Sequence, residues 1–162
     1  MCYHVFSKFP RWQTMFSQTQ EYALRAVVWL ASHIEEGAVG HQRIADETSV
    51  PASYLSKVLQ SLTRAGLLIS RRGVGGGFQL DRDPAELTVL EVVNAVDPIK
   101  RITTCPLGLK THGTHLCPMH SRLDQALELV TDALGKSTIA EVLSEPGRPL
   151  PLVETPKSRR KR

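Results

Sequence analysis

Residues 51–80 combine a helix-length apolar repeat with a glycine-rich turn between two short apolar runs, and this pairing restricts the fold more than any other feature of the chain. The predicted helix opens at Pro51, which needs no donor in a first helical turn, and stops at Gly66. Its apolar face consists of Ala52, Leu55, Val58, Leu59 and Leu62. The runs "LLISRR" and "FQL" on either side of "GVGGG" predict a β-hairpin directly after this helix.

The residues before this segment predict two further helices. Ser17 and Gln20 form a capping box that opens the first helix, which ends near Gly37. Its apolar positions are Ala23, Val27, Leu30, Ala31 and Ile34. A short second helix, "HQRIADE", follows Gly40, and the turn "TSV" joins it to the helix that opens at Pro51. Two helices joined so tightly indicate a helix-turn-helix, and the hairpin that follows would be its wing.

The second half of the chain predicts two helices separated by a loop. Thr88 and Glu91 form another capping box at the start of "VLEVVNAV", and Pro98 ends that helix. From about Arg122, apolar residues recur with alternating steps of four and three, a spacing suited to pairing with another helix. This predicted dimer seam consists of Leu123, Leu127, Val130 and Leu134. The expected fold is mainly α with a small β-hairpin wing: a winged helix-turn-helix plus a long C-terminal dimerisation helix.

These signals divide the chain into five parts. Residues 15–97 form the expected winged helix-turn-helix, residues 98–120 a sensor or ligand loop, and residues 121–143 the dimerisation helix with a short C-terminal helix. Residues 1–14 lack periodicity and are expected to be a disordered extension or a misannotated start. Residues 144–162 are rich in proline and charge and are expected to be a disordered basic tail.

Composition narrows the class of protein. A length of 162 residues with 41% hydrophobic content suits one domain with a core. Three cysteines, an odd number, in a chain without a secretory signal argue against a disulfide framework and for a reducing cytoplasm. The most apolar early run, "YALRAVVWLA", is interrupted by Arg25 and is too short to span a bilayer, so we expect no membrane partner. A net charge of +4 is weak evidence for nucleic-acid binding unless the charges gather on one surface.

The exposed face of the helix that opens at Pro51 has hydroxyl groups near its start and cations further along. Such a helix suits the major groove of double-stranded DNA, although an isolated amphipathic helix more often presents an ordinary solvated face. The candidate DNA-contacting residues on this helix are Ser53, Tyr54, Ser56, Lys57, Gln60 and Arg64.

The predicted hairpin favours the DNA interpretation. Arg71 and Arg72 precede the glycine turn, where a guanidinium can reach the negatively charged minor groove. Glycines such as Gly75 and Gly76 would let the backbone approach phosphates. A nucleotide-binding phosphate loop is the alternative for "GVGGG", but neither a helix start nor a GK[ST] sequence follows it. DNA binding is therefore the leading hypothesis.

Residues 105–120, "CPLGLKTHGTHLCPMH", hold two of the three cysteines and three of the six histidines. Sulfur and imidazole ligands packed this closely suit iron, zinc or copper, but the spacing fits no pattern of paired zinc-finger half-sites. The remaining histidines His4, His33 and His41 are expected on the surface, and Cys2 lies in the N-terminal extension.

The chain resembles the Rrf-two family of winged-helix regulators, which includes IscR-like and NsrR-like repressors. The resemblance runs from about Met15 to Leu143 and rests on "EYALRAVVWLA", "IADETSVPASYLSKVLQSLTRAGLLISRRGVGGGFQL" and "LTVLEVVNAVD". It implies a homodimer with crossing C-terminal helices and a loop that often holds an iron-sulfur cluster. It also implies that Ser53, Ser56 and Lys57 approach bases and that Arg72 enters the minor groove.

The resemblance gives the cysteine segment a candidate ligand set with one gap. Cluster-binding members use three cysteines at intervals of six, followed by a histidine three residues after the last. Cys105, Cys117 and His120 match this pattern, whereas Thr111 occupies the middle-cysteine position. The residues that could complete the set are His112, His115 and Glu21, the last at a position where some family members supply a carboxylate. A [2Fe-2S] cluster is favoured, zinc would suit the same donors, and loss of any cofactor is the third reading.

These observations predict a cytoplasmic, homodimeric transcription regulator, expected to be a repressor, that binds a pseudo-palindromic operator. The cysteine segment would sense redox state, nitric oxide or iron-sulfur status. A cluster-free regulator that responds to a metabolite or a protein partner, or a zinc or thiol switch, is the alternative. An enzyme or a metal-binding module is a further class, but the chain offers no arrangement of nucleophile, base and orienting acid.

Overall fold

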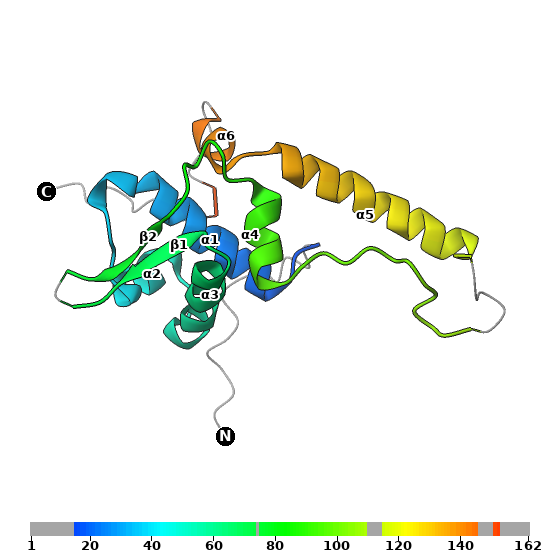
Figure 1. Cartoon of the computed structure of the whole chain (residues 1–162), viewed down its shortest axis with the longest axis horizontal. Coiled ribbons are helices and arrows are strands. Elements are labelled where there is room, and N and C mark those ends of the chain that lie inside the picture. The colour runs from blue at the N-terminus through cyan, green and yellow to red at the C-terminus, as the bar shows by residue number, and fades with distance from the viewer. Residues whose placement is uncertain (1–14, 74, 110–114, 146–150, 153–162) are drawn as a thin grey trace, which may run out of the picture.

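The computed structural model describes residues 15–73, 75–109, 115–145 and 151–152. Its elements are, in order, α1 (Gln18–Ser32), a 3-10 helix (Ile34–Glu36), α2 (His41–Thr48), α3 (Ala52–Arg64), β1 (Leu68–Arg71), β2 (Gly77–Leu80), α4 (Val89–Val96), α5 (Pro118–Lys136) and α6 (Ile139–Ser144). Figure 1 shows α1 to α4, α6 and the hairpin gathered on one side, with α5 extending away from them. The described chain is mainly helical with one antiparallel hairpin, as predicted.

α1 lies at the centre of the packed part and contacts α2, α3, α4 and α6. The predicted capping box opens it: the Gln20 amide donates to Ser17 Oγ over 3.3 Å, and the Ser17 amide donates to Gln20 Oε1 over 2.7 Å. The Gln20 side chain is buried, and its Nε2 also donates to the Asp97 carbonyl over 2.6 Å. One side chain therefore caps α1 and attaches the end of α4 to it.

The end of α1 differs from the prediction in three respects. The α-helix stops at Ser32, and a 3-10 turn occupies most of the interval to Gly37. Ile34 was predicted on the apolar face, but it is 45% exposed because this turn carries it off the helical repeat. His33 was predicted on the open surface, but it is half-buried and stacks on the Trp29 ring with 4.2 Å between centroids.

The helix-turn-helix consists of α2 and α3, which pack against α1 through the predicted apolar face. Pro51 is the N-cap of α3 rather than its first helical residue, and its carbonyl accepts from the Tyr54 and Leu55 amides over 2.9 and 3.0 Å. The fully or almost fully buried residues of α3 are Leu55, Val58, Leu59 and Leu62. Their burial directs the opposite face of α3 outward.

The hairpin pairs β1 with β2 in antiparallel register from Leu68 opposite Leu80 to Arg71 opposite Gly77. A third segment joins it at one point: the Val39 amide donates to the Phe78 carbonyl over 2.9 Å, and the Phe78 amide donates to the Val39 carbonyl over 2.8 Å. The hairpin is thus attached to the segment between α1 and α2.

The chain returns to the core after α5. The Ile139 amide donates to the Leu87 carbonyl over 2.8 Å, and the Val89 amide donates to the Ser137 carbonyl over 2.9 Å. Ile139 is completely buried in the core formed by α1, α3 and α4. The predicted short C-terminal helix, α6, therefore completes the packing of the winged helix.

Candidate DNA interface and metal site

The outward face of α3 contains the residues predicted to contact DNA. Ser53, Tyr54, Lys57 and Gln60 are exposed, and Ser56 is half-buried. Tyr54 is 57% exposed even though its ring meets the Tyr22 ring edge-on, with 6.2 Å between centroids. The Tyr22 hydroxyl accepts a hydrogen bond of 2.7 Å from Gln18 Nε2, so α1 holds the aromatic ring beside the start of α3.

Ser56 has partners inside the molecule. Its hydroxyl donates to the Ala52 carbonyl over 3.1 Å, and its Oγ lies 3.0 Å from His41 Nε2. The same His41 nitrogen lies 3.1 Å from the Ala52 carbonyl oxygen. His41 was predicted as a surface residue, but it is half-buried because it joins the first turn of α2 to the first turn of α3.

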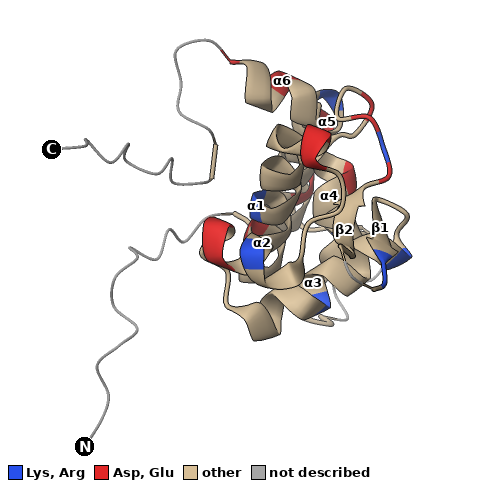
Figure 2. Cartoon of the chain, turned by 90° about the vertical axis from the view of Figure 1, so that its left-hand side faces the viewer, with Lys and Arg blue, Asp and Glu red and all other residues tan. Residues whose placement is uncertain are grey.

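The hairpin presents two arginines beside α3. Arg71 and Arg72 are exposed, and β1 packs directly against α3. Figure 2 marks basic residues on both elements. Among the residues that the structure describes, Lys57, Arg64, Arg71 and Arg72 form no ion pair with a carboxylate. These four cations are therefore available to phosphate groups.

The glycine turn has an explanation within the protein itself. Gly75 has a φ of +76°, a backbone conformation that L side chains rarely adopt. A Cβ on Gly76 would overlap the Arg71 carbonyl oxygen, and one on Gly77 would overlap the carbonyl of Val39. The glycines are needed to close the hairpin and to bring it against Val39, so their presence is not by itself evidence of phosphate contacts.

Two of the three predicted metal ligands meet at the start of α5. This helix begins at Pro118, three residues before the expected start at residue 121, because a proline is well suited to the first helical position. His120 therefore lies in the first turn of α5 rather than in the preceding loop. Cys117 is the N-cap, and its Sγ lies 3.3 Å from His120 Nδ1. A sulfur and an imidazole nitrogen at this separation are donors of the kind that iron and zinc prefer.

The other candidate ligands do not complete this pair in the described chain. Cys105 is half-buried, and His115 is exposed. Thr111 and His112 lie outside the described residues. Glu21 accepts a hydrogen bond of 2.6 Å from Arg25 one helical turn away. Across the described residues, no three His, Cys, Asp or Glu side chains converge closely enough to hold a metal ion. The donor types fit a metal site, and two of the donors are in place.

The predicted dimer seam lies on α5, a helix that its own chain buries only partly. None of the nineteen residues of α5 is buried. Leu123 is 48% exposed, and Leu127 and Val130 are half-buried. Leu134 differs from them because it packs against the winged-helix core of its own chain. Leu123, Leu127 and Val130 are not part of that core.

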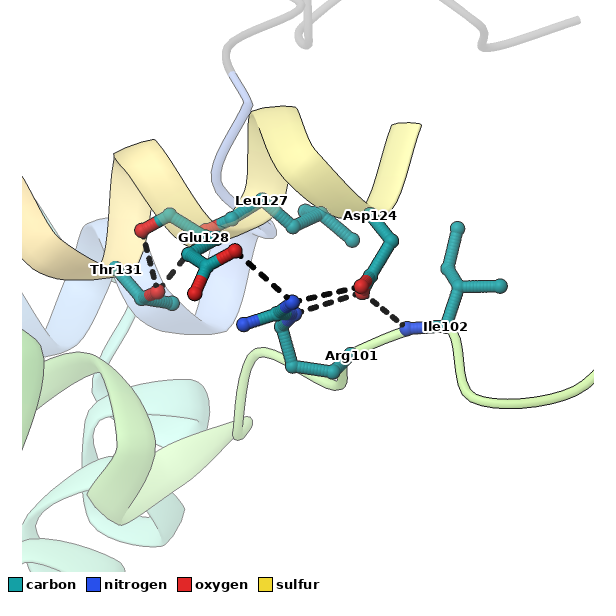
Figure 3. A network of polar contacts seen from close by, with 6 residues as sticks. All are labelled: Arg101, Ile102, Asp124, Leu127, Glu128 and Thr131. Carbon is teal, nitrogen blue, oxygen red and sulfur yellow. Dashed lines mark hydrogen bonds and ion pairs between the residues drawn. The ribbon is translucent and has the colours of Figure 1, made fainter. Parts of the chain in front are cut away.

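A polar contact fixes the segment after α4 to α5 (Figure 3). Arg101 donates to both carboxylate oxygens of Asp124 over 2.7 Å and to Glu128 over 3.3 Å, and the Ile102 amide donates to Asp124 over 2.9 Å. The hydrogen bonds from Arg101 lower the pKa of Asp124 from 3.8 to about 2, and the carboxylates raise the pKa of Arg101. Arg101 and Ile102, a few residues before Cys105, are therefore attached to α5.

Comparison with known proteins identifies the family. Residues 16–145 match the family described as Rrf2: Iron-dependent Transcriptional regulator. The HTH-type transcriptional regulator IscR of Xenorhabdus nematophila is 33% identical over 122 residues, which cover 75% of this chain and 74% of that protein. The chain belongs to the Rrf2 family of transcriptional regulators.

Solved structures agree with the Rrf2 fold. T. potens IscR matches with a TM-score of 0.66 at 24% identity, covering 81% of this chain and 87% of that one. CymR, the global cysteine regulator of B. subtilis, matches with a TM-score of 0.64 at 22% identity, covering 79% and 95%. These likenesses support the predicted winged-helix architecture. Within the described ranges, every helix is too short or too polar to cross a membrane.

The sequence did not indicate three contacts that shape this Rrf2 chain. Arg101 and Asp124 are far apart in the sequence, and neither stands in a motif. His41 and Ser56 belong to different helices, so their contact depends on how α2 and α3 pack. Ala38 and Val39 stand between Gly37 and Gly40, where two apolar residues give only a weak strand signal.

Proposed function

We propose that this Rrf2 regulator is a cytoplasmic homodimer that binds a pseudo-palindromic operator in double-stranded DNA and has no enzymatic activity. α3 would enter the major groove, and Arg71 and Arg72 would reach the adjacent minor groove. The observation that carries the proposal is the exposed basic surface of α3 and the hairpin, where the described cations form no internal ion pairs. Charge that is not neutralised within the protein is available for DNA phosphates.

An Arg72→Ala variant tests this assignment. We expect operator affinity to fall by about 1–3 kcal/mol and the salt dependence of binding to weaken by roughly one unit of slope, because one cation leaves the DNA surface. Titration of labelled operator at several salt concentrations measures both quantities. Lys136→Ala is the matched control, since this exposed lysine lies on α5 and pairs with Asp132. Unchanged affinity and slope in Arg72→Ala would remove the hairpin from the DNA interface.

Dimerisation through α5 is the second part of the proposal. A helix of this length with no buried residue gains little stability from its own chain, and Leu123, Leu127 and Val130 on it follow a coiled-coil spacing. Leu123, Leu127 and Val130 would form the contact between the two copies. The expected operator then has two half-sites about one helical turn of DNA apart.

The third part concerns the cysteine segment. Cys117 and His120, which approach within 3.3 Å, together with Cys105, would hold an iron-sulfur cluster of the [2Fe-2S] type. His112, His115 or Glu21 would supply the remaining ligand in place of a middle cysteine. Such a cluster supplies a one-electron redox change and sensitivity to nitric oxide. The description of the family as iron-dependent supports this assignment.

Anaerobic purification tests the cluster. The wild-type protein should show visible absorption with matching iron and acid-labile sulfide, and Cys105→Ala and Cys117→Ala should each abolish the absorption. Cys2→Ala is the matched control, because this third cysteine lies outside the proposed ligand set. A colourless wild-type protein without iron and sulfide would exclude the cluster.

A cluster-free regulator or a zinc or thiol switch is the second candidate. The observation in its favour is that no three such donors converge among the described residues. A protein of similar fold is named as a global cysteine regulator. A colourless preparation that binds its operator would support this candidate, and metal analysis would then separate a zinc site from a metal-free thiol or ligand switch.

A further inference from the structure

His41, Ala52 and Ser56 form a hydrogen-bonded triangle at the start of α3. His41 Nε2 lies 3.1 Å from the Ala52 carbonyl oxygen and 3.0 Å from Ser56 Oγ. Ser56 Oγ lies 3.1 Å from the same carbonyl oxygen. The triangle joins two helices, because His41 is the first residue of α2. It stands at a helix start that has no side-chain cap of its own.

The hydrogen positions in this triangle follow from the chemistry of its members. A carbonyl oxygen only accepts hydrogen bonds, so His41 Nε2 must carry a hydrogen to contact Ala52 favourably. The same N–H is then shared with Ser56 Oγ, which accepts it. The Ser56 hydroxyl hydrogen is directed to the Ala52 carbonyl. The opposite tautomer would place a nitrogen lone pair against the carbonyl lone pairs at 3.1 Å.

This arrangement limits what Ser56 can offer to DNA. A serine hydroxyl has one hydrogen and two acceptor positions. In the triangle the hydrogen is used by Ala52 and one acceptor position by His41, which leaves a single acceptor position. Ser56 is half-buried and lies one turn from exposed Ser53 and beside exposed Lys57, so this position belongs to the outward side of α3.

We infer that His41 positions Ser56 as a hydrogen-bond acceptor that selects adenine or cytosine over guanine or thymine at one position of each operator half-site. In the major groove, adenine and cytosine present amino donors, whereas guanine and thymine present acceptors. The inference rests on the proposed function, because Ser56 meets a base edge only if α3 enters the major groove. His41 acts through Ser56 and need not contact DNA.

The test is a selection of bound sequences from a randomised pool of double-stranded DNA by the full chain. The wild-type protein should enrich a pseudo-palindrome in which one position per half-site favours adenine or cytosine by about three- to tenfold, the effect of one hydrogen bond. Ser56→Ala should remove the preference at that position alone. His41→Ala should weaken it, because the Ser56 hydroxyl is then held by the Ala52 carbonyl alone and can turn its hydrogen toward the DNA.

Two further variants separate the positioning of Ser56 by His41 from a general loss of packing. His41→Gln should restore the preference, because its amide nitrogen donates from a similar distance along the side chain. Thr63→Val should change no position; it removes a hydroxyl that donates to the Leu59 carbonyl over 2.8 Å in the same helix and has no histidine partner. Thermal unfolding of each variant would confirm that it folds.

Three results would overturn the inference while DNA binding stands. The position sensitive to Ser56→Ala could favour guanine or thymine, Ser56→Ala could alter no position, or His41→Ala could weaken all sequences equally with base preferences unchanged. A wild-type protein that enriches no sequence would instead overturn the proposed function, and the inference with it.

Discussion

α1 and α5 are both long helices, but their surroundings are opposite. Nine of the fifteen residues of α1 are buried, whereas none of the nineteen residues of α5 is. α1 is stabilised by packing against four other helices of the same chain. α5 is held by Arg101 through Asp124 and by Ile139 beyond its end, and Leu123 and Leu129 on it are exposed. The winged helix thus buries its apolar residues within one chain, whereas α5 leaves apolar residues uncovered.

The largest expected effect is on the free energy of unfolding, and it distinguishes the winged-helix core from α5. Ile139→Ala should lower the free energy of unfolding by about 2–5 kcal/mol, because it leaves a cavity in a packed core. Leu129→Ala is the matched control on α5, where the side chain is 72% exposed, and should change stability by less than about 0.5 kcal/mol. Urea unfolding at low protein concentration measures both. Equal effects would show that α5 is as well packed as the core.

Two glycine variants, Gly77→Ala and Gly75→Ala, test how tightly the hairpin of the winged helix packs against Val39. Gly77→Ala should destabilise the protein by about 1–3 kcal/mol, because the added methyl overlaps the Val39 carbonyl. Gly75→Ala should cost less, about 1 kcal/mol, since it adds backbone strain without overlap. Thermal unfolding compares the two. If Gly75→Ala were the more damaging, the attachment of the hairpin to Val39 would be unimportant.

Leu123→Ala examines the uncovered face of α5. We expect this change to weaken the dimer by about 1–2 kcal/mol, because a half-exposed leucine becomes buried only in the dimer. The unfolding of the monomer should hardly change. Analytical ultracentrifugation over a range of concentrations gives the dimer constant. An unaltered constant would mean that α5 pairs through another face or remains single.

The smallest effect concerns the contact between Arg101 and Asp124. Because the folded-state pKa of Asp124 is lowered to about 2, the stabilisation from this contact between the segment after α4 and α5 is complete above about pH 4. It is lost as the pH falls toward 2. NMR titration of the Asp124 carboxyl carbon should give a midpoint near the lower value. In Arg101→Ala the midpoint should return to the ordinary range. A midpoint that is already ordinary in the wild-type protein would show that the contact is absent in solution.

The sequence was sufficient for most of the fold because its strongest signals are local. The capping boxes at Ser17 and Thr88 involve residues three apart, and both are present with the expected partners. The glycine run identified the hairpin for the same reason. The expected start at residue 121 is three residues later than the start of α5, because Pro118 was not recognised as a helix-opening residue.

The candidate site was harder to predict because it depends on contacts between elements. The exposed residues of α3 could be read from helical periodicity, but the bond from His41 to Ser56 could not. A heptad spacing likewise does not show which element covers the apolar residues that follow it. Leu134 was therefore grouped with the dimer seam, although it packs on its own core.

The return of Ile139 to the core affects how far the winged helix could be moved between proteins. A graft of residues 15–97 onto a different sensory domain would carry the DNA-facing elements but leave behind the side chain that fills their interior. The recipient would need an apolar residue at the same place. The winged helix and the region of α5 and α6 are therefore not interchangeable modules, and a folded hybrid would have to be joined beyond α6.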